Sequence, residues 1–106
     1  MASEVGRGEV WITDLGKAGK ERPCLVLSVP ATDAERALAV IAPATTAVWG
    51  TRYEVKVEAR FLKKEGVFDV QNLQAVPLAK FHRKLGALTS EQMKSIEAAV
   101  RLWLGL

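Results

Sequence analysis

The sequence of 106 residues contains only one cysteine and one histidine, and this scarcity excludes several kinds of site. Cys24 has no second cysteine with which to form a disulfide or a cysteine-based metal site. Its apolar neighbours indicate that it acts as a small buried hydrophobe. His82 cannot form a two-histidine acid–base pair within one subunit. Because it lies in the basic segment 80–84, we expect a solvated strand face there rather than a catalytic group.

Long apolar runs and the common short catalytic motifs are also absent. No apolar stretch approaches the roughly 20 residues of a membrane-spanning helix, and the N-terminus lacks the apolar core of a signal peptide. The sequence has no Walker-type phosphate loop, no HExxH motif and no Cys/His metal spacing. We therefore expect a cytoplasmic protein that contacts no membrane and uses neither a metal nor a cofactor.

The composition is that of a globular protein. Hydrophobic residues make up 49% and charged residues 25% of the chain, which predicts a single domain over residues 1–106. The formal net charge of +3 and a pI near 9.2 permit an anionic partner such as RNA, although net charge says nothing about the fold.

Alternation and turn residues predict a series of short strands. They are expected at residues 9–15, 23–29, 38–42 and 52–58, once or twice within 67–78, and at 81–88. Pro23 should begin the second strand and Pro43 should end the third, because proline cannot donate to a sheet's hydrogen bonds. The segment 52–58 has the clearest alternation, and residues 59–64 should form a short helical turn.

One amphipathic helix should follow the strands. Thr89 and Gln92 form a capping box, and Gly105 should end the helix. Glu97 and Arg101 are spaced to pair on its polar side. The apolar face comprises Met93, Ile96, Val100, Trp103 and Leu104. The fold class is therefore mainly β with a C-terminal α-helix, in which the helix packs on a compact, partly open β-barrel.

Polar side chains that suit an anionic ligand lie at the ends of two buried strands. Arg22 precedes the second strand, and Thr45 and Thr46 follow the third. Arginine offers a planar fork of donors that matches phosphate, and a threonine hydroxyl adds a neutral donor. A simpler alternative is that Arg22 pairs with Glu21 or Asp14 and that Thr45 completes a turn. Spacing alone favours this simpler alternative.

Several segments, taken in order, resemble the MazF/PemK family, the ribonuclease toxins of bacterial type II toxin–antitoxin systems. They are residues 8–11, 22–28, 43–46, 66–76 and 102–106. The resemblance implies an SH3-like, partly open β-barrel of the CcdB/PemK kind that forms a homodimer. It further implies sequence-specific cleavage of single-stranded RNA without a metal, through attack by the RNA's own 2′-OH, and inhibition by a cognate antitoxin protein.

The resemblance also assigns roles to residues. It implies that Arg22 and Thr45 are catalytic. The remaining site residues are expected to bind RNA, and they are Lys17, Lys20, Thr46, Trp49 and Gln71. The alternatives are a solvated loop for the two lysines and a half-buried aromatic cap for Trp49. Where some relatives place an additional arginine and a carboxylate, this chain has Asp69 and Gln71, and Asp69 would repel phosphate.

Two other functions are compatible with the same barrel. One is a gyrase poison resembling CcdB, which would inhibit supercoiling and leave RNA intact. The other is a non-catalytic RNA-binding module, which would bind RNA without cutting it. Departures at Asp69 and Gln71 keep the second alternative open.

Overall fold

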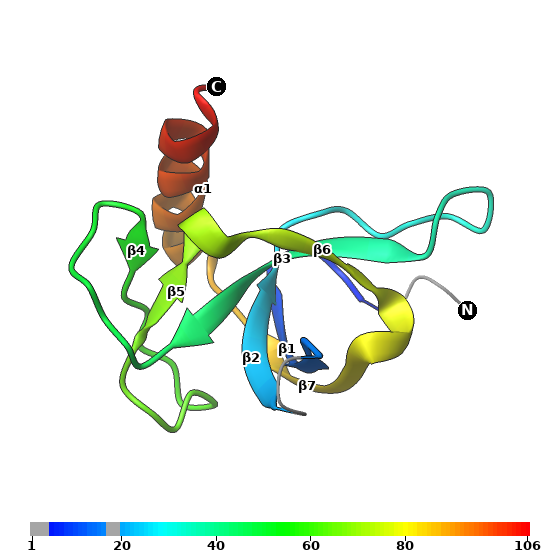
Figure 1. Ribbon diagram of the computed structural model, residues 1–106, viewed down its shortest axis with the longest axis horizontal. Coiled ribbons are helices and arrows are strands. Elements are labelled where there is room, and N and C mark those ends of the chain that lie inside the picture. Colours follow the sequence, from blue (N-terminus) through cyan, green and yellow to red (C-terminus); the bar gives the residue numbers. More distant parts are fainter. Residues whose placement is uncertain (1–4, 17–19) are drawn as a thin grey trace.

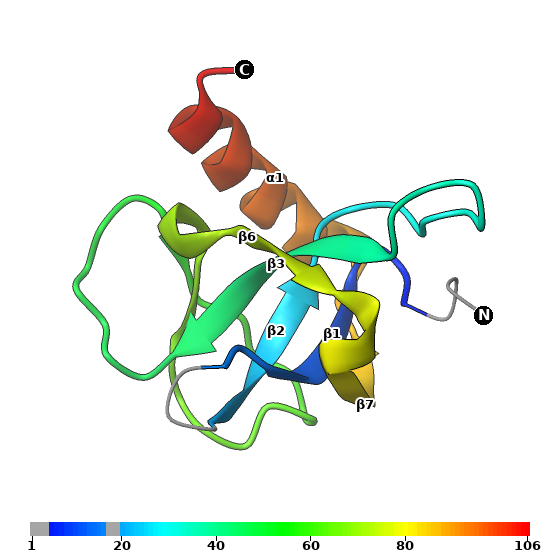
Figure 2. The same cartoon turned by 45° about the vertical axis from the view of Figure 1, so that its right-hand side comes forward.

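The computed structural model describes residues 5–16 and 20–106, and it consists of a curved sheet with one helix at the C-terminal end (Figures 1 and 2). The strands are β1 (Glu9–Asp14), β2 (Glu21–Val26), β3 (Leu38–Thr45), β4 (Glu54–Val55), β5 (Val67–Asp69), β6 (Gln74–Pro77) and β7 (Phe81–Ala87). Two short 3₁₀ turns, η2 (Val70–Asn72) and η3 (Leu78–Lys80), flank β6, and the helix is α1 (Ser90–Leu104).

The sheet is antiparallel, and its strands lie in the order β4-β5-β3-β2-β1-β7, with β6 paired to β3 as well. The two ends of this order, β4 and β7, do not close on each other within the described residues. The expected mainly β fold with a C-terminal helix, arranged as a partly open barrel, is therefore confirmed.

β2 lies between two apolar clusters, which explains its unbroken apolar sequence. Leu25 faces one cluster together with Val10, Phe68 and Ile96 of the helix. The alternate residues of β2 face a second cluster on the other side of the sheet. A strand buried on both faces needs apolar residues at successive positions, not at every second one. This rigid strand carries Arg22 near its start.

The helix is confirmed with both of its end signals. The Thr89 hydroxyl accepts a hydrogen bond from Gln92 N at 3.1 Å, and the Gln92 side chain accepts one from Thr89 N at 2.9 Å. Gly105 ends the helix at φ 73°. The expected Glu97 pair is wrong in its partner, because Glu97 forms its ion pair with Arg7.

The last turn of the helix is more exposed than its apolar sequence predicts. Trp103 and Leu104 belong to the expected apolar face, yet they are 40% and 50% exposed. The helix therefore reaches past the sheet at its C-terminal end, as Figure 2 shows.

Within residues 5–16 and 20–106, no helix is long and apolar enough to cross a membrane.

Both proline positions were predicted incorrectly. Pro23 is the third residue of β2, not the first. β2 pairs with β3 only from Cys24 onward, so Pro23 has a strand partner on one side only and can be accommodated. Pro43 does not end β3, because Ala44 and Thr45 go on to pair with β5.

The expected strand at 52–58 is reduced to the two residues of β4. Its alternation reflects burial, since Val55 and Val57 both pack against the core. Its backbone partner, β5, is only three residues long, so a longer ladder cannot form. The segment 67–78 contains two strands and 81–88 contains one, as predicted. Residues 59–64 contain a single turn, closed by Leu62 N donating to Ala59 O at 3.0 Å.

Candidate active site

Arg22 and Thr45 line the same cleft, a space of about 180 Å³ at the end of β3. The strand register explains why they meet. Cys24 pairs with Pro43 in the antiparallel β2–β3 ladder. The ladder ends there, but the same register continued by two residues sets Arg22 across from Thr45, and both side chains line the cleft. The other lining residues are Leu15, Lys20, Pro43, Ala44, Asp69, Asn72 and Gln74.

The Arg22 side chain is exposed and has no carboxylate within ion-pair distance among the described residues. Both acids of the simpler alternative are engaged elsewhere. Glu21 pairs with His82, and Asp14 lies 3.9 Å from Lys80 and also accepts a hydrogen bond from Gly16 N. The guanidinium of Arg22 is thus available to an anionic ligand.

The expected turn at Thr45 is present, and it is compatible with a role in the site. Thr45 Oγ1 accepts a hydrogen bond from Ala47 N at 3.0 Å. Accepting this bond fixes the oxygen but does not use the hydroxyl proton. Thr45 can therefore complete the turn and still donate a hydrogen bond into the cleft.

Asp69 brings a carboxylate into the same cleft. Its Oδ1 accepts a hydrogen bond from Gln71 N at 3.1 Å and caps η2. The predicted RNA-binding residue Gln71 is exposed and does not line the cleft, whereas Asn72 and Gln74 do. Strand alternation would have placed Gln71 beside Asp69. A 3₁₀ turn instead brings every third residue into line, which carries Asn72 to that side.

The other predicted RNA-binding residues do not all lie in the cleft. Lys20 lines the cleft, and Lys17 lies outside the described residues. Thr46 and Trp49 are exposed in the loop after β3 and do not line the cleft. Trp49 is 86% exposed, so the alternative of a half-buried cap is wrong.

Cys24 follows Arg22 by two residues in β2 and is fully buried. Burial raises the pKa of its thiol to about 11, so the sulfur is a neutral thiol at physiological pH. Its Sγ donates to the backbone oxygen of Arg22 at 3.5 Å. Cys24 therefore supports the backbone of Arg22 and does not act as a nucleophile.

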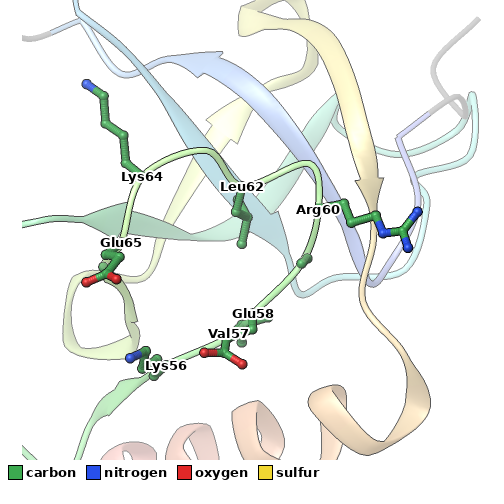
Figure 3. A pocket seen from close by; sticks show the side chains of 9 residues that line it. Lys56, Val57, Glu58, Arg60, Leu62, Lys64 and Glu65 are labelled. Carbon is green, nitrogen blue, oxygen red and sulfur yellow. The ribbon is translucent and has the colours of Figure 1, made fainter.

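A larger cavity of about 530 Å³ lies elsewhere, under the loop formed by residues 56–66 (Figure 3). Leu62 points into it, while Arg60 and Lys64 extend away from it. Its lining contains both bases and acids, among them Lys56 and Glu65. The smaller cleft is the better candidate, because Arg22 and Thr45 meet there from two strands of the sheet, whereas the larger cavity is lined mainly by one loop. Among the described residues, no three His, Cys, Asp or Glu side chains gather as a metal site would require.

The cleft joins one guanidinium, one hydroxyl donor and one carboxylate on rigid strands. Donors fixed in advance around a forming oxyanion stabilise it more than mobile water does. A carboxylate beside them can accept a proton. This set suits a reaction in which negative charge develops on phosphate oxygens while a hydroxyl group loses its proton.

Comparison with known proteins identifies the family of this chain. Residues 6–104 match the family described as the PemK-like, MazF-like toxin of type II toxin–antitoxin systems. The probable endoribonuclease MazF5 of Mycobacterium tuberculosis is 29% identical, over 96% of this chain and 94% of its own length.

Solved structures give the same result. The Mycobacterium tuberculosis toxin MazF-mt6 superposes with a TM-score of 0.80 at 28% identity, covering 92% of this chain and 97% of that one. A mycobacterial endoribonuclease, solved in complex with its cognate antitoxin, has a TM-score of 0.82 at 26% identity and 96% coverage of both chains.

Proposed function

Because this chain belongs to the family of PemK-like, MazF-like toxins of type II toxin–antitoxin systems, we propose that it cuts single-stranded RNA in the cleft that contains Arg22 and Thr45. The family match favours a MazF-like endoribonuclease over a gyrase poison of the CcdB kind. The observation that carries the assignment of the site is the convergence of these two side chains from neighbouring strands, with the guanidinium free of acidic partners among the described residues.

Cleavage proceeds by attack of a ribose 2′-OH on the adjacent phosphorus. The new bond forms between the 2′ oxygen and phosphorus, and the bond from phosphorus to the 5′ oxygen breaks. The products are a 2′,3′-cyclic phosphate and a 5′-OH end. Negative charge accumulates on the non-bridging oxygens in the transition state. Arg22 neutralises that charge with its fork of donors, and Thr45 adds a hydrogen bond. Loss of one such donor costs about 10²- to 10³-fold in kcat.

The proton of the attacking 2′-OH needs an acceptor, and Asp69 is the carboxylate that lines the cleft. One of its oxygens is engaged by Gln71 N, which leaves the other to receive the proton. The leaving 5′ oxygen takes its proton from water. Arginine is too basic to serve as the proton acceptor at neutral pH. The chain, the RNA and water supply every group that this reaction requires, so we expect cleavage without a metal.

RNA binding involves residues inside and outside the cleft. Lys20, Asn72 and Gln74 line it and can contact the backbone or base edges of the strand. Proteins that recognise single-stranded RNA stack its bases on aromatic side chains. The exposed ring of Trp49 can stack a base in this way. Lys17, Thr46 and Gln71 remain proposed contacts along the flanking nucleotides.

We also propose two protein partners, an antitoxin and a second copy of this chain. A related structure contains an endoribonuclease with its cognate antitoxin, and we expect an acidic antitoxin to cover Arg22 here. We also expect a homodimer, since an apolar patch is exposed where α1 ends; it consists of Leu102, Trp103, Leu104 and Leu106. The place of action is the cytoplasm, where such a toxin meets RNA.

Incubation of the purified protein with a long unstructured RNA in EDTA tests the function. We expect cuts that leave 5′-OH ends. Arg22→Ala and Thr45→Val should abolish or strongly slow cleavage, and the exposed Arg60→Ala should cut like the wild type. Intact RNA, or an Arg22→Ala variant as active as the wild type, would refute the assignment. RNA that is bound but never cut would identify a non-catalytic binding module.

A further inference from the structure

One carboxylate accepts three backbone hydrogen bonds from the loop after Thr45, residues 46–53. Glu54 Oε2 accepts a hydrogen bond from Trp49 N at 3.0 Å. Its Oε1 accepts two more, from Gly50 N at 2.6 Å and from Thr51 N at 3.0 Å. Successive backbone N–H groups that converge on one anion form a nest, which usually requires a left-handed residue. Gly50 provides it at φ 80°.

Glu54 is itself fixed to the sheet next to the cleft. In the β4–β5 ladder it pairs with Asp69, which lines the cleft, and Val55 beside it pairs with the buried Phe68. The following backbone is held as well, because Val70 N donates to Tyr53 O at 3.0 Å. The carboxylate therefore connects the tip of an exposed loop to the rigid edge of the active-site sheet.

This connection determines where Trp49 stands. The Trp49 side chain is 86% exposed, although its backbone N–H is tied to Glu54. Trp49 is the fourth residue after Thr45, so their Cα atoms lie at most about 14 Å apart. The backbone of Trp49 is thus fixed by Glu54, while its ring stands in solvent on the loop that follows Thr45. An exposed ring that is positioned in advance can stack on a base with little loss of conformational entropy.

We propose that Glu54 is a positioning residue for RNA binding, whose carboxylate fixes the backbone of residues 49–51 so that Trp49 is presented as a stacking platform for a base that flanks the scissile nucleotide. The inference rests on the proposed function, since it takes RNA as the ligand. Glu54 does not contact the RNA. Its charge would by itself repel phosphate, so its contribution to binding has to come through the loop.

Steady-state cleavage of a short RNA that contains one mapped cut site tests this role. Trp49→Ala should raise KM about tenfold, within the range of one lost base stack, and leave kcat unchanged. Glu54→Ala should also raise KM at unchanged kcat. In the Trp49→Ala background, Glu54→Ala should have no further effect, because both substitutions remove the same contact.

Two further variants separate positioning from charge. Glu54→Gln keeps one acceptor oxygen and so can retain the bonds to Gly50 and Thr51, and its KM should lie between those of the wild type and Glu54→Ala. Glu58→Ala removes an exposed acid four residues away that does not hold the loop, and it should leave KM unchanged or lower it. A lower KM in Glu54→Ala, or a full additional effect in the Trp49→Ala background, would overturn the proposal.

A measurement without RNA keeps the inference distinct from the proposed function. Arg52 is exposed within the loop and is a site for trypsin. Loss of the hydrogen bonds to Glu54 should accelerate tryptic cleavage at Arg52 in Glu54→Ala but not in Glu58→Ala, with the thermal transition of both variants retained. Unchanged cleavage at Arg52 would overturn the positioning role. Failure of the wild type to cut RNA would overturn the proposed function alone.

Discussion

Gly66→Ala tests how closely catalysis depends on the position of Thr45. A Cβ atom at Gly66 would lie 2.4 Å from the Thr45 backbone oxygen and 3.1 Å from its carbonyl carbon. Ordinary contact begins near 3.4 Å, so the two segments must separate by about 1 Å. The neighbour is backbone and cannot rotate away as a side chain would. The end of β3, which carries the Thr45 hydroxyl, has to shift.

A displacement of about 1 Å in a positioned catalytic group costs on the order of 10²-fold in rate. We therefore expect Gly66→Ala to lower kcat about 100-fold. Overpacking at this site should cost roughly 1–3 kcal/mol of stability, so the variant should fold with a lowered Tm. Single-turnover cleavage of a mapped RNA, together with thermal unfolding, measures both effects.

Gly86→Ala is the matched control. A Cβ atom there would also lie 2.4 Å from its nearest neighbour, Cδ2 of Phe61. The neighbour in this case is a side-chain ring, and it does not line the cleft. Gly86→Ala should lower Tm and leave kcat within a few-fold of the wild type. Wild-type kcat in Gly66→Ala, or an equal loss of kcat in both variants, would refute the dependence of catalysis on Thr45 placement.

Further predictions address the proton acceptor, the buried thiol, a titrating acid and the helix cap. Asp69→Asn should lower kcat about 10²- to 10⁴-fold if Asp69 accepts the 2′-OH proton, whereas a carboxylate that only repels phosphate would give a faster variant. Cys24, with its pKa raised to about 11 by burial, should resist thiol reagents at pH 8 until the protein unfolds; labelling at the rate of a free thiol would contradict its burial. Partial burial tends to raise the pKa of Glu9, but hydrogen bonds from three neighbours outweigh it and lower the pKa below 4.5. Its stabilising contribution is therefore present above pH 4.5 and is lost as the pH falls through the folded-state pKa, so acid unfolding of Glu9→Gln should depend less on pH in that range. Thr89→Ala should cost about 1 kcal/mol in denaturant unfolding, and an unchanged midpoint would show that the cap contributes nothing.

The two ends of the helix could be predicted because their signals are local. Thr89 and Gln92 bond to each other within the first turn, and Gly105 bonds back to Arg101 within the last. Its ion pair could not be predicted, because Glu97 meets Arg7 from the other end of the chain. The same limit applies to the segment 52–58. Its alternation was sufficient to bury Val55 in part, but it could not reveal how short the partner strand β5 would be.

Only part of the candidate site could be predicted from the sequence. Consecutive strands commonly pair, and this brought Arg22 and Thr45 to one rim. The positions of Asn72 and Gln74 depend on η2, which interrupts the strand period, and no sequence pattern signalled that turn. The three hydrogen bonds that Glu54 accepts from backbone N–H groups could not be predicted either, because almost every residue carries such a donor whatever its side chain.

A single substitution in the RNA tests the central claim most directly. Once the cut site is mapped, an oligonucleotide with a 2′-deoxy sugar only on the 5′ side of the scissile phosphate is compared with its all-ribose counterpart, both in EDTA. The cleft of Arg22 and Thr45 is proposed to stabilise attack by that 2′-OH, so the all-ribose strand should be cut to a 5′-OH end and the substituted strand should remain intact. Cleavage of the substituted strand at the same bond would contradict the mechanism.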